Sequence, residues 1–325
     1  MTRLLLLATG DTIAFDPRVR GRGAFAPGAE LLAALPAGSV PGQVTVEDVL
    51  AGPSWDLDPP TMLGLARRAR TAILTEGYHG VVITHGTDTL EETAFLTDLL
   101  AGEAAERAGI VLTGAMRPPT ELSPDGPRNL LSALVAAADP GLPGVGVVAC
   151  LNDELHAARW VTKVDATTVA AFSSAPHPPL GRVVGNRVEL LAPPPPRPPA
   201  PTGEPEPSVA LIKTYPGIDG TLLHAVVDAG ARGVVLEGTG MANVPVGLFA
   251  AIDELTGWDV PVVIASRCRT REMPADEIST GGTIAARVGA ISARGLAPVK
   301  ARAALMVALG DGGVKQARAW FDRLG

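Results

Sequence analysis

The chain has 325 residues, of which 46% are apolar and 19% charged, so it can bury a large core in one large or two medium domains. Its formal net charge of -7 gives no basic surface for nucleic acid or anionic membrane, which disfavours both as partners. No apolar run approaches a membrane span, and the apolar start at residues 4–8 is too short for a signal core, so we expect a soluble, cytoplasmic protein.

The first part of the chain alternates between predicted strands and helices. Apolar runs predict strands at residues 4–8, 44–49, 81–84, 109–113, 145–151 and 160–165. Amphipathic or capped segments predict helices at residues 29–35 and 59–76, from about residue 90 onward, and through 138 after a cap at Asp125. A loop with three arginines lies between the first strand and the first helix, and we expect these arginines to be solvated surface charges.

A proline-rich stretch at residues 192–208 is predicted to be an extended linker, because such a density of proline excludes a helix or a central strand. We therefore place the domains at residues 1–191 and 209–325. The second part again alternates, with strands predicted at residues 209–213, 233–237 and 261–266 and helices at 220–229, 245–255, 298–309 and 314–324. This order predicts an α/β fold with two domains, each with a mainly parallel sheet flanked by helices and right-handed crossovers.

The cysteines and histidines indicate no metal site, because none of them cluster with the spacing of metal ligands. Cys150 and Cys268 both follow or interrupt apolar, strand-like runs, so we expect two buried free thiols. A disulfide between them stays open. No Walker loop, Gly-x-Ser-x-Gly elbow or Gly-x-Gly-x-x-Gly turn is present, so nucleotide binding and ordinary serine hydrolysis lack support.

Threonine-rich turns follow two predicted strands, at the strand ends where open α/β sheets bind their ligands. A threonine hydroxyl acts as a nucleophile when a base removes its proton, and a buried lysine with a lowered pKa can be that base. Lys163 lies in apolar sequence and is the candidate lysine, while backbone N–H groups of the turns at residues 10–12 and 86–87 are candidates for an oxyanion hole. Local physics favours a simpler interpretation, in which Asp88 or Thr89 caps a helix and Lys163 pairs structurally.

Two motifs carry a resemblance to a known family. The first turn, Thr9-Gly10-Asp11-Thr12-Ile13-Ala14, resembles the first signature of the bacterial-type L-asparaginases, the threonine amidohydrolases. The second turn is similar to their second signature almost residue for residue, and reads Thr84-His85-Gly86-Thr87-Asp88-Thr89-Leu90-Glu91-Glu92-Thr93-Ala94. Residues 114–118, 123–130, 161–163 and 172–174 match the stretches that follow in the family.

The resemblance implies a larger N-terminal and a smaller C-terminal α/β domain. It implies hydrolysis of the side-chain amide of L-asparagine to L-aspartate and ammonia, with a small-molecule amide as substrate and no metal or cofactor. It also implies a homodimer or a homotetramer built from close dimers, with the sites at the dimer interface.

The resemblance also implies roles for single residues. Thr12 would be the nucleophile, and Lys163 would be the base for Thr87. Asp88 would hold the amino group of the substrate, and Ser54 would contact its α-carboxylate. Asn243 fits the C-terminal asparagine that reaches the site of the neighbouring subunit.

Four departures from the family pattern concern the substrate. Asp11 stands at the second glycine of the first signature and places a carboxylate beside the nucleophile. Phe25 occupies the lid position of a family tyrosine, Trp55 replaces the glutamine after Ser54, and Thr283 lies near the position of the glutamate lent by the neighbour. Two alternatives therefore stay open: an amidohydrolase for glutamine or a bulkier amide that contacts Trp55 and Phe25, or an inactive asparaginase-like binding protein.

Overall fold

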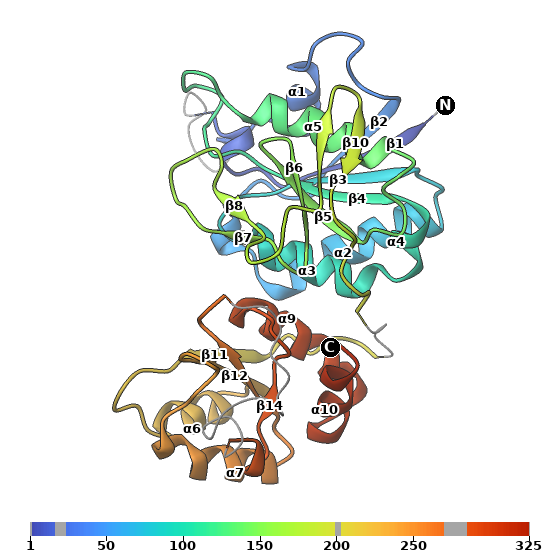
Figure 1. Cartoon of the computed structure of the whole chain (residues 1–325). Helices are drawn as coiled ribbons and strands as arrows, with labels where there is room; N and C mark the ends of the chain where they lie inside the picture. Colours follow the sequence, from blue (N-terminus) through green and yellow to red (C-terminus); the bar gives the residue numbers. More distant parts are fainter. Residues whose placement is uncertain (1, 17–23, 199–202, 270–284, 325) are drawn as a thin grey trace. The chain divides into compact units, whose positions relative to one another are not determined.

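The structure is a computed structural model that describes residues 2–16, 24–198, 203–269 and 285–324. The chain divides into two compact units, Met1–Pro195 and Pro196–Gly325, and each is described by itself (Figure 1). The division falls within the proline-rich residues 192–208. Among the residues described here, no helix is both long and apolar enough to span a membrane.

An eight-stranded sheet forms the centre of the first unit, in the order β10-β9-β6-β5-β4-β3-β1-β2. Its strands are β1 (Arg3–Ala8), β2 (Gln43–Asp48), β3 (Gly80–Thr84), β4 (Gly109–Thr113), β5 (Val147–Leu151), β6 (Glu154–Ala157), β9 (Gly181–Val184) and β10 (Arg187–Leu190). The pairs from β2 to β5 are parallel, as expected.

Three strands that the sequence analysis did not predict extend this sheet in antiparallel order: β6, β9 and β10. Asn152 and Asp153 come directly after the strand predicted at residues 145–151. Both adopt left-handed backbone angles, with φ of 51° and 62°, and form the two-residue turn between β5 and β6. The sheet is therefore mainly parallel with an antiparallel edge.

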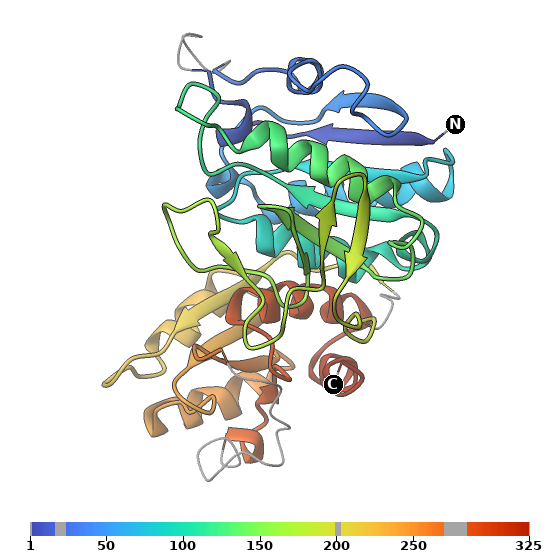
Figure 2. The same cartoon turned by 45° about the horizontal axis from the view of Figure 1, so that its top comes forward.

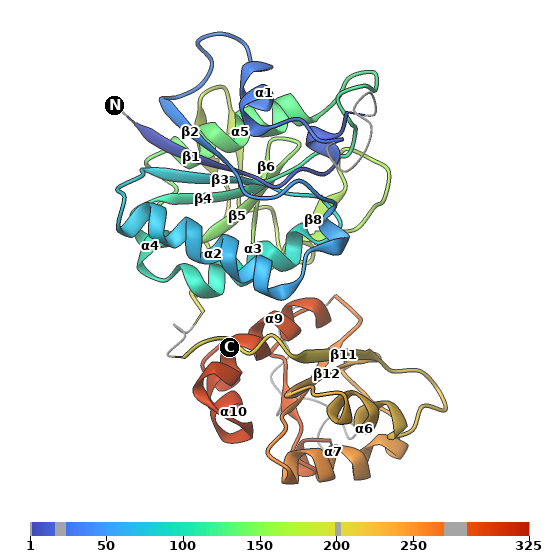
Figure 3. The ribbon, with the colours of Figure 1, turned by 180° about the vertical axis from the view of Figure 1, so that it is seen from behind.

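Helices cover both faces of this sheet (Figures 1 and 3). Leu4 and Leu6 of β1 pack on one face with α1 (Gly28–Ala33) and α5 (Gly126–Ala138), and Figure 2 shows α5 lying across that face. Leu5 and Leu7 pack on the other face with α2 (Pro59–Leu74), α3 (Leu90–Ala101) and α4 (Glu103–Arg107). Because successive strand side chains point to opposite faces, the continuous leucine run of β1 fits a strand that is buried on both sides.

Short elements complete the first unit at the carboxyl edge of the sheet. Two 3₁₀ turns follow β1 and β2: η1 (Thr12–Ala14) and η2 (Ser54–Asp56). The predicted strand at 160–165 is reduced to β7 (Thr162–Lys163), which pairs with β8 (Phe172–Ser173) in a separate two-stranded antiparallel sheet.

The strand order places a topological switch point between β1 and β3. The chain leaves β1 to form β2 on one side and returns to form β3 on the other side. Ligands of open α/β sheets bind outside the carboxyl ends of the strands at such a point. The two threonine-rich turns both begin there.

The second unit contains a four-stranded parallel sheet in the order β11-β12-β13-β14. The strands are β11 (Val209–Lys213), β12 (Gly233–Gly238), β13 (Val262–Ser266) and β14 (Ile291–Ser292). Helices α6 (Thr221–Asp228) and α7 (Phe249–Gly257) cover one face, and α9 (Pro298–Ala308) lies on the other (Figures 1 and 3). Within its described residues, this unit also contains η3 (Val246–Leu248), η5 (Leu309–Asp311) and α10 (Val314–Asp322).

The two cysteines are free and differ in their exposure. Cys150 lies in β5 and is buried, as expected, whereas Cys268 is exposed. The expectation of a second buried thiol was wrong, because β13 ends at Ser266 and Cys268 already lies in the loop that follows.

Candidate active site

Two hydroxyl groups join the strand ends from which the site is built. The Thr9 Oγ1 hydroxyl at the end of β1 donates to the carbonyl of Thr84 at the end of β3, at 2.7 Å. The Thr9 N–H donates to Thr84 Oγ1 at 3.4 Å. Both residues are buried. These bonds hold the starts of the two turns side by side.

Thr12, the first residue of η1, has a carboxylate in direct contact with its hydroxyl. Asp11 Oδ1 accepts hydrogen bonds from Thr12 N at 2.6 Å and from Thr12 Oγ1 at 3.1 Å. Asp11 Oδ2 accepts a third bond from the backbone N–H of Ser54 at 2.6 Å. Asp11 is only 6% exposed, with φ of 67° and ψ of -163°, a conformation that is otherwise almost restricted to glycine.

Asp11 changes the expectation for an oxyanion hole in this turn. The N–H of Thr12 already donates to the Asp11 carboxylate, so in this structure it is not free to bind a substrate oxygen. Gly86 makes room for the same carboxylate, because a Cβ at Gly86 would overlap with Asp11 Oδ2 and Ser54 Oγ. The two turns therefore interlock through a buried carboxylate.

Lys163 of β7 brings together the polar residues of the second turn. Its Nζ donates to Thr87 Oγ1 at 2.8 Å and to Asp88 Oδ1 at 2.6 Å, and its side chain is 15% exposed. Its backbone N–H donates to Glu91 Oε1 in the first turn of α3 at 3.3 Å. Three of the predicted site residues thus meet in one cluster, and a lysine nitrogen lies within proton-transfer reach of a threonine hydroxyl.

The simpler interpretation by helix capping was wrong for these side chains. Thr89 occupies the N-cap position of α3 without a capping hydrogen bond, and its Oγ1 donates instead to the Ser54 carbonyl at 2.8 Å. Asp88 pairs with Lys163. The predicted cap Asp125 likewise directs its carboxylate to the N–H groups of Met116 and Arg117 and to the Asn129 side chain. In each case the side chain binds groups other than the backbone N–H groups of the first helical turn.

Ser54 and Trp55 lie at η2 in contrasting environments. Ser54 is 1% exposed, and its Oγ has no hydrogen-bond partner within the described ranges. Trp55 is 65% exposed and offers an apolar ring beside the site. A substrate that uses the Ser54 hydroxyl therefore requires a local rearrangement.

Phe25 and Asn243, two further predicted site residues, make their described contacts within their own units. Phe25 pairs with Phe15, with ring centroids 6.1 Å apart, and packs against the core on the face covered by α1 and α5. Asn243 lies in the second unit, in a tight turn where its backbone pairs with Thr239 at 2.8 and 2.9 Å. Thr283 lies outside the described residues.

Sequence reasoning missed two buried groups, His85 and Glu91. His85 Nδ1 lies 2.8 Å from the Gly86 carbonyl and Nε2 lies 2.8 Å from Thr93 Oγ1. Burial lowers the pKa of His85, so the ring is neutral, with a proton on Nδ1 that donates to the carbonyl. Glu91 Oε2 has no hydrogen-bond partner in the described structure. The position of both residues within the second turn motif was the available signal.

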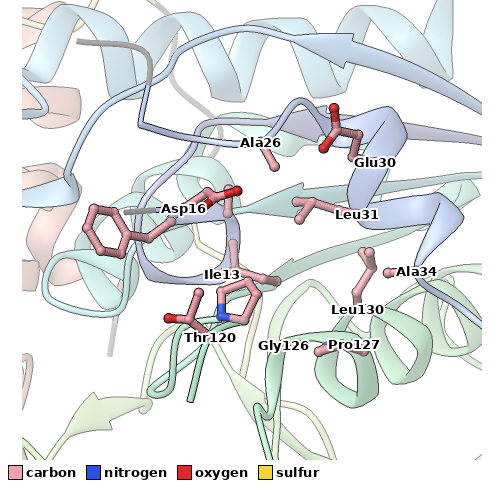
Figure 4. Close-up of a pocket in the computed structure, with 13 residues that line it drawn as sticks. Ile13, Asp16, Ala26, Glu30, Leu31, Ala34, Thr120, Gly126, Pro127 and Leu130 are labelled. Carbon is pink, nitrogen blue, oxygen red and sulfur yellow. The ribbon is translucent and has the colours of Figure 1, made fainter. Parts of the chain in front are cut away.

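A separate pocket of about 410 Å³ lies beside η1, between α1 and the start of α5. Figure 4 shows Ile13, Leu31 and Leu130 in its lining, together with the carboxylates of Asp16 and Glu30. Thr87, Asp88 and Lys163, which we call the threonine–lysine cluster, do not line it. The described residues also contain no group of three or more His, Cys, Asp or Glu side chains that could hold a metal ion.

Comparisons with known proteins find matches along nearly the whole chain. Residues 3–196 match the family model "Asparaginase, N-terminal", and residues 208–321 match "Glutaminase/Asparaginase C-terminal domain". A probable L-asparaginase of Deinococcus radiodurans is 36% identical over 321 residues, which cover 97% of this chain and 95% of the relative. A probable periplasmic L-asparaginase of Haemophilus influenzae is 32% identical over 323 residues, covering 95% and 89%. The crystal structure of a probable cytoplasmic L-asparaginase from Campylobacter jejuni is similar with a TM-score of 0.83 and 30% identity, covering 99% of both chains.

Proposed function

The chain belongs to the asparaginase family, and we propose that it hydrolyses the side-chain amide of L-asparagine to L-aspartate and ammonia. The observation that carries the proposal is the bridge from Lys163 Nζ to Thr87 Oγ1 and Asp88 Oδ1, beside the turn that holds Thr12. Relatives named L-asparaginase cover nearly the full chain and support the same activity.

The reaction is proposed to run through an acyl-enzyme on Thr12. Its Oγ1 attacks the amide carbon, the amide nitrogen leaves as ammonia, and water then releases the acid. Lys163 Nζ lies 2.8 Å from Thr87 Oγ1 and is proposed as the base for this hydroxyl, which in turn activates the water. Asp88 is half exposed and is proposed to hold the α-ammonium group of the substrate.

A second candidate activity concerns a bulkier or less polar amide. The Trp55 ring is 65% exposed beside Ser54, where it offers an apolar contact in place of a polar one. Such a contact would favour an amide larger than asparagine. The chemistry at Thr12, Thr87 and Lys163 would be the same.

The proposal is tested by ammonia release from L-asparagine, with L-glutamine and a panel of small amides assayed in parallel. We expect saturable release from asparagine. Release from another amide alone would establish the second candidate, whereas no release from any amide would refute amidohydrolase activity.

Two variants test the assigned roles. Thr12→Ala and Lys163→Met should each lower kcat by at least about 10³-fold, since removal of one member of a catalytic group costs most of its rate enhancement. Two matched controls should keep full activity. They are Thr45→Ala, at an exposed residue of β2, and Lys213→Met, whose side chain is 69% exposed in the second unit. Ammonia release retained by Thr12→Ala would exclude it as the nucleophile, and unchanged turnover of Lys163→Met would exclude Lys163 as the base.

The assembly and location of the protein are proposed from the same family membership. We propose a homodimer or homotetramer in which Asn243 reaches the site of a neighbouring subunit. Light scattering on purified protein tests this, and a fully active monomer would refute it. We also propose a cytoplasmic location, as in the name of the Campylobacter jejuni relative, and recovery of the protein in a periplasmic fraction would refute it.

A further inference from the structure

We propose that Asp11 is a catalytic residue, the general base that takes the proton from the Thr12 hydroxyl. The inference rests on the proposed function, in which Thr12 is the nucleophile. Thr12 Oγ1 donates to Asp11 Oδ1 at 3.1 Å, its one hydrogen bond to another described residue. A nucleophilic hydroxyl requires a nearby acceptor for its proton, and Asp11 lies where that acceptor is needed.

The carboxylate is held in place by two turns. Asp11 Oδ1 also accepts from Thr12 N at 2.6 Å, and Oδ2 accepts from Ser54 N of η2 at 2.6 Å. Gly86 contacts the same carboxylate from the end of β3. With 6% exposure and three hydrogen bonds, the acceptor is oriented before the substrate arrives. Its backbone conformation is seldom occupied by residues other than glycine, and such conformations cluster at active sites.

Neighbouring groups are engaged elsewhere. His85 follows β3 and is a titratable residue near Asp11, but its Nδ1 donates to the Gly86 carbonyl and its Nε2 accepts from Thr93 Oγ1. Lys163 is bound to Thr87 and Asp88. Phe25 has no hydroxyl group. Within the described structure, Asp11 is the acceptor that contacts the Thr12 hydroxyl.

Asp11 can transfer the protons of the reaction with no reactant other than the amide and water. Asp11 Oδ1 takes the proton of Thr12 Oγ1 while Oγ1 bonds to the amide carbon, and the carbonyl π electrons move to oxygen. The proton then passes from Asp11 to the amide nitrogen as the C–N bond breaks, so ammonia leaves and an ester to Thr12 remains. In the second half, the water activated by Thr87 adds to the ester carbon, and the proton that this water loses reaches Asp11, which donates it to Thr12 Oγ1 as the ester C–O bond breaks and the acid leaves.

The first test replaces Asp11 with asparagine, which keeps an oxygen against Thr12 but is not a base. Asp11→Asn should lower kcat for the amide that the wild-type protein hydrolyses by about 10²- to 10⁴-fold, with KM within about threefold of wild type. Asp139→Asn is the matched control, because Asp139 also accepts two backbone N–H bonds, from Gly141 and Val188, but contacts no threonine hydroxyl. An Asp11→Asn variant with a kcat within about threefold of wild type would overturn the proposal.

The second test uses Asp11→Gly. In Asp11→Asn the new side-chain NH₂ group would face the N–H donor of Ser54, which would disturb the fold. Formate should fill the vacated space and restore activity at least about tenfold, since it supplies a base between the same donors. Nitrate has a similar planar shape and charge but is a negligible base, and equal restoration by nitrate would show that Asp11 only fills the site. Thr12→Ala separates the two proposals: activity in that variant refutes the nucleophile, whereas an inactive Thr12→Ala with a fully active Asp11→Asn refutes Asp11 alone.

Discussion

Replacing Gly86 with alanine should destabilise the first unit, because the new methyl group would occupy the space of the Asp11 carboxylate. An ideal Cβ at Gly86 overlaps with Asp11 Oδ2 and with Ser54 Oγ. The Ser54 hydroxyl can rotate, but the carboxylate is fixed between the N–H groups of Thr12 and Ser54 at 2.6 Å each. Alanine at position 86 therefore displaces Asp11 and breaks both bonds.

The magnitude follows from these two bonds and from the backbone of Asp11. Hydrogen bonds to a charged group contribute about 1.5–3 kcal/mol each, so the loss of both costs about 3–6 kcal/mol. Relaxation of the unusual Asp11 backbone returns about 1–3 kcal/mol. The net loss is about 0–5 kcal/mol, and its central value of about 2–3 kcal/mol lowers Tm by about 4–12 °C in a domain of this size.

Thermal unfolding followed by circular dichroism measures this change. Gly64→Ala is the matched control, because Gly64 is exposed in α2 with open space around its Cα and should gain about 0.5–1 kcal/mol. The double variant Asp11→Gly/Gly86→Ala should recover stability relative to Gly86→Ala, because the displaced group is gone. A double variant no more stable than Gly86→Ala would refute the steric reasoning.

Three further predictions concern pH, thiols and assembly. Burial lowers the pKa of His85 from its usual 6.5, so the unfolded chain binds a proton at a higher pH than the folded chain does. The stability that depends on neutral His85 is therefore full above about pH 6.5 and falls below it. His85→Gln should reduce the change in urea midpoint between pH 7.5 and pH 5. A thiol reagent should label only Cys268 in the native protein and both cysteines in denaturant, since Cys150 is buried and burial raises its pKa; labelling of native Cys150 would contradict this. Thr12→Ala and Asn243→Ala subunits are each expected to be inactive, and mixing them should restore about a quarter of wild-type activity if each site uses residues of two chains. No recovery after proven exchange of subunits would refute shared sites.

The two threonine-rich turns of the site could be predicted because they follow the ends of buried strands. Buried runs such as that of β1 are recognisable in sequence, and parallel strands bring their carboxyl ends to one edge of the sheet. The contact of Lys163 with Thr87 could not be derived from spacing, since β7 has two residues and joins no strand of the main sheet. The apolar neighbours of Lys163 in the sequence made it a candidate base, and its pairing with Thr87 was implied by the resemblance.

The starts of α3 and α5 were predicted, but the antiparallel edge and the hydrogen-bond partners of the side chains at these helix starts could not be, for different reasons. Strands β6, β9 and β10 have four residues each, too few for an alternation of apolar and polar side chains to be recognised. Asp125 and Thr89 occupy N-cap positions, but their side chains bind distant backbone groups instead of the local N–H groups. Capping rules consider the N–H groups of the first helical turn, whereas these side chains bind groups that the fold brings close from elsewhere.

Asp11 shows why this site could be predicted only in part. A local rule assigns glycine to a backbone with φ of 67° and ψ of -163°, and by that rule aspartate is unfavourable. The fold compensates with two N–H donors from separate turns and with a glycine at position 86 that leaves space for the carboxylate. Two of these compensations, the N–H of Ser54 and the space at Gly86, lie far from Asp11 in the sequence. Local strain supported by long-range contacts is expected where a side chain serves the reaction, and Asp11→Gly should therefore relax the backbone while removing the acceptor at Thr12.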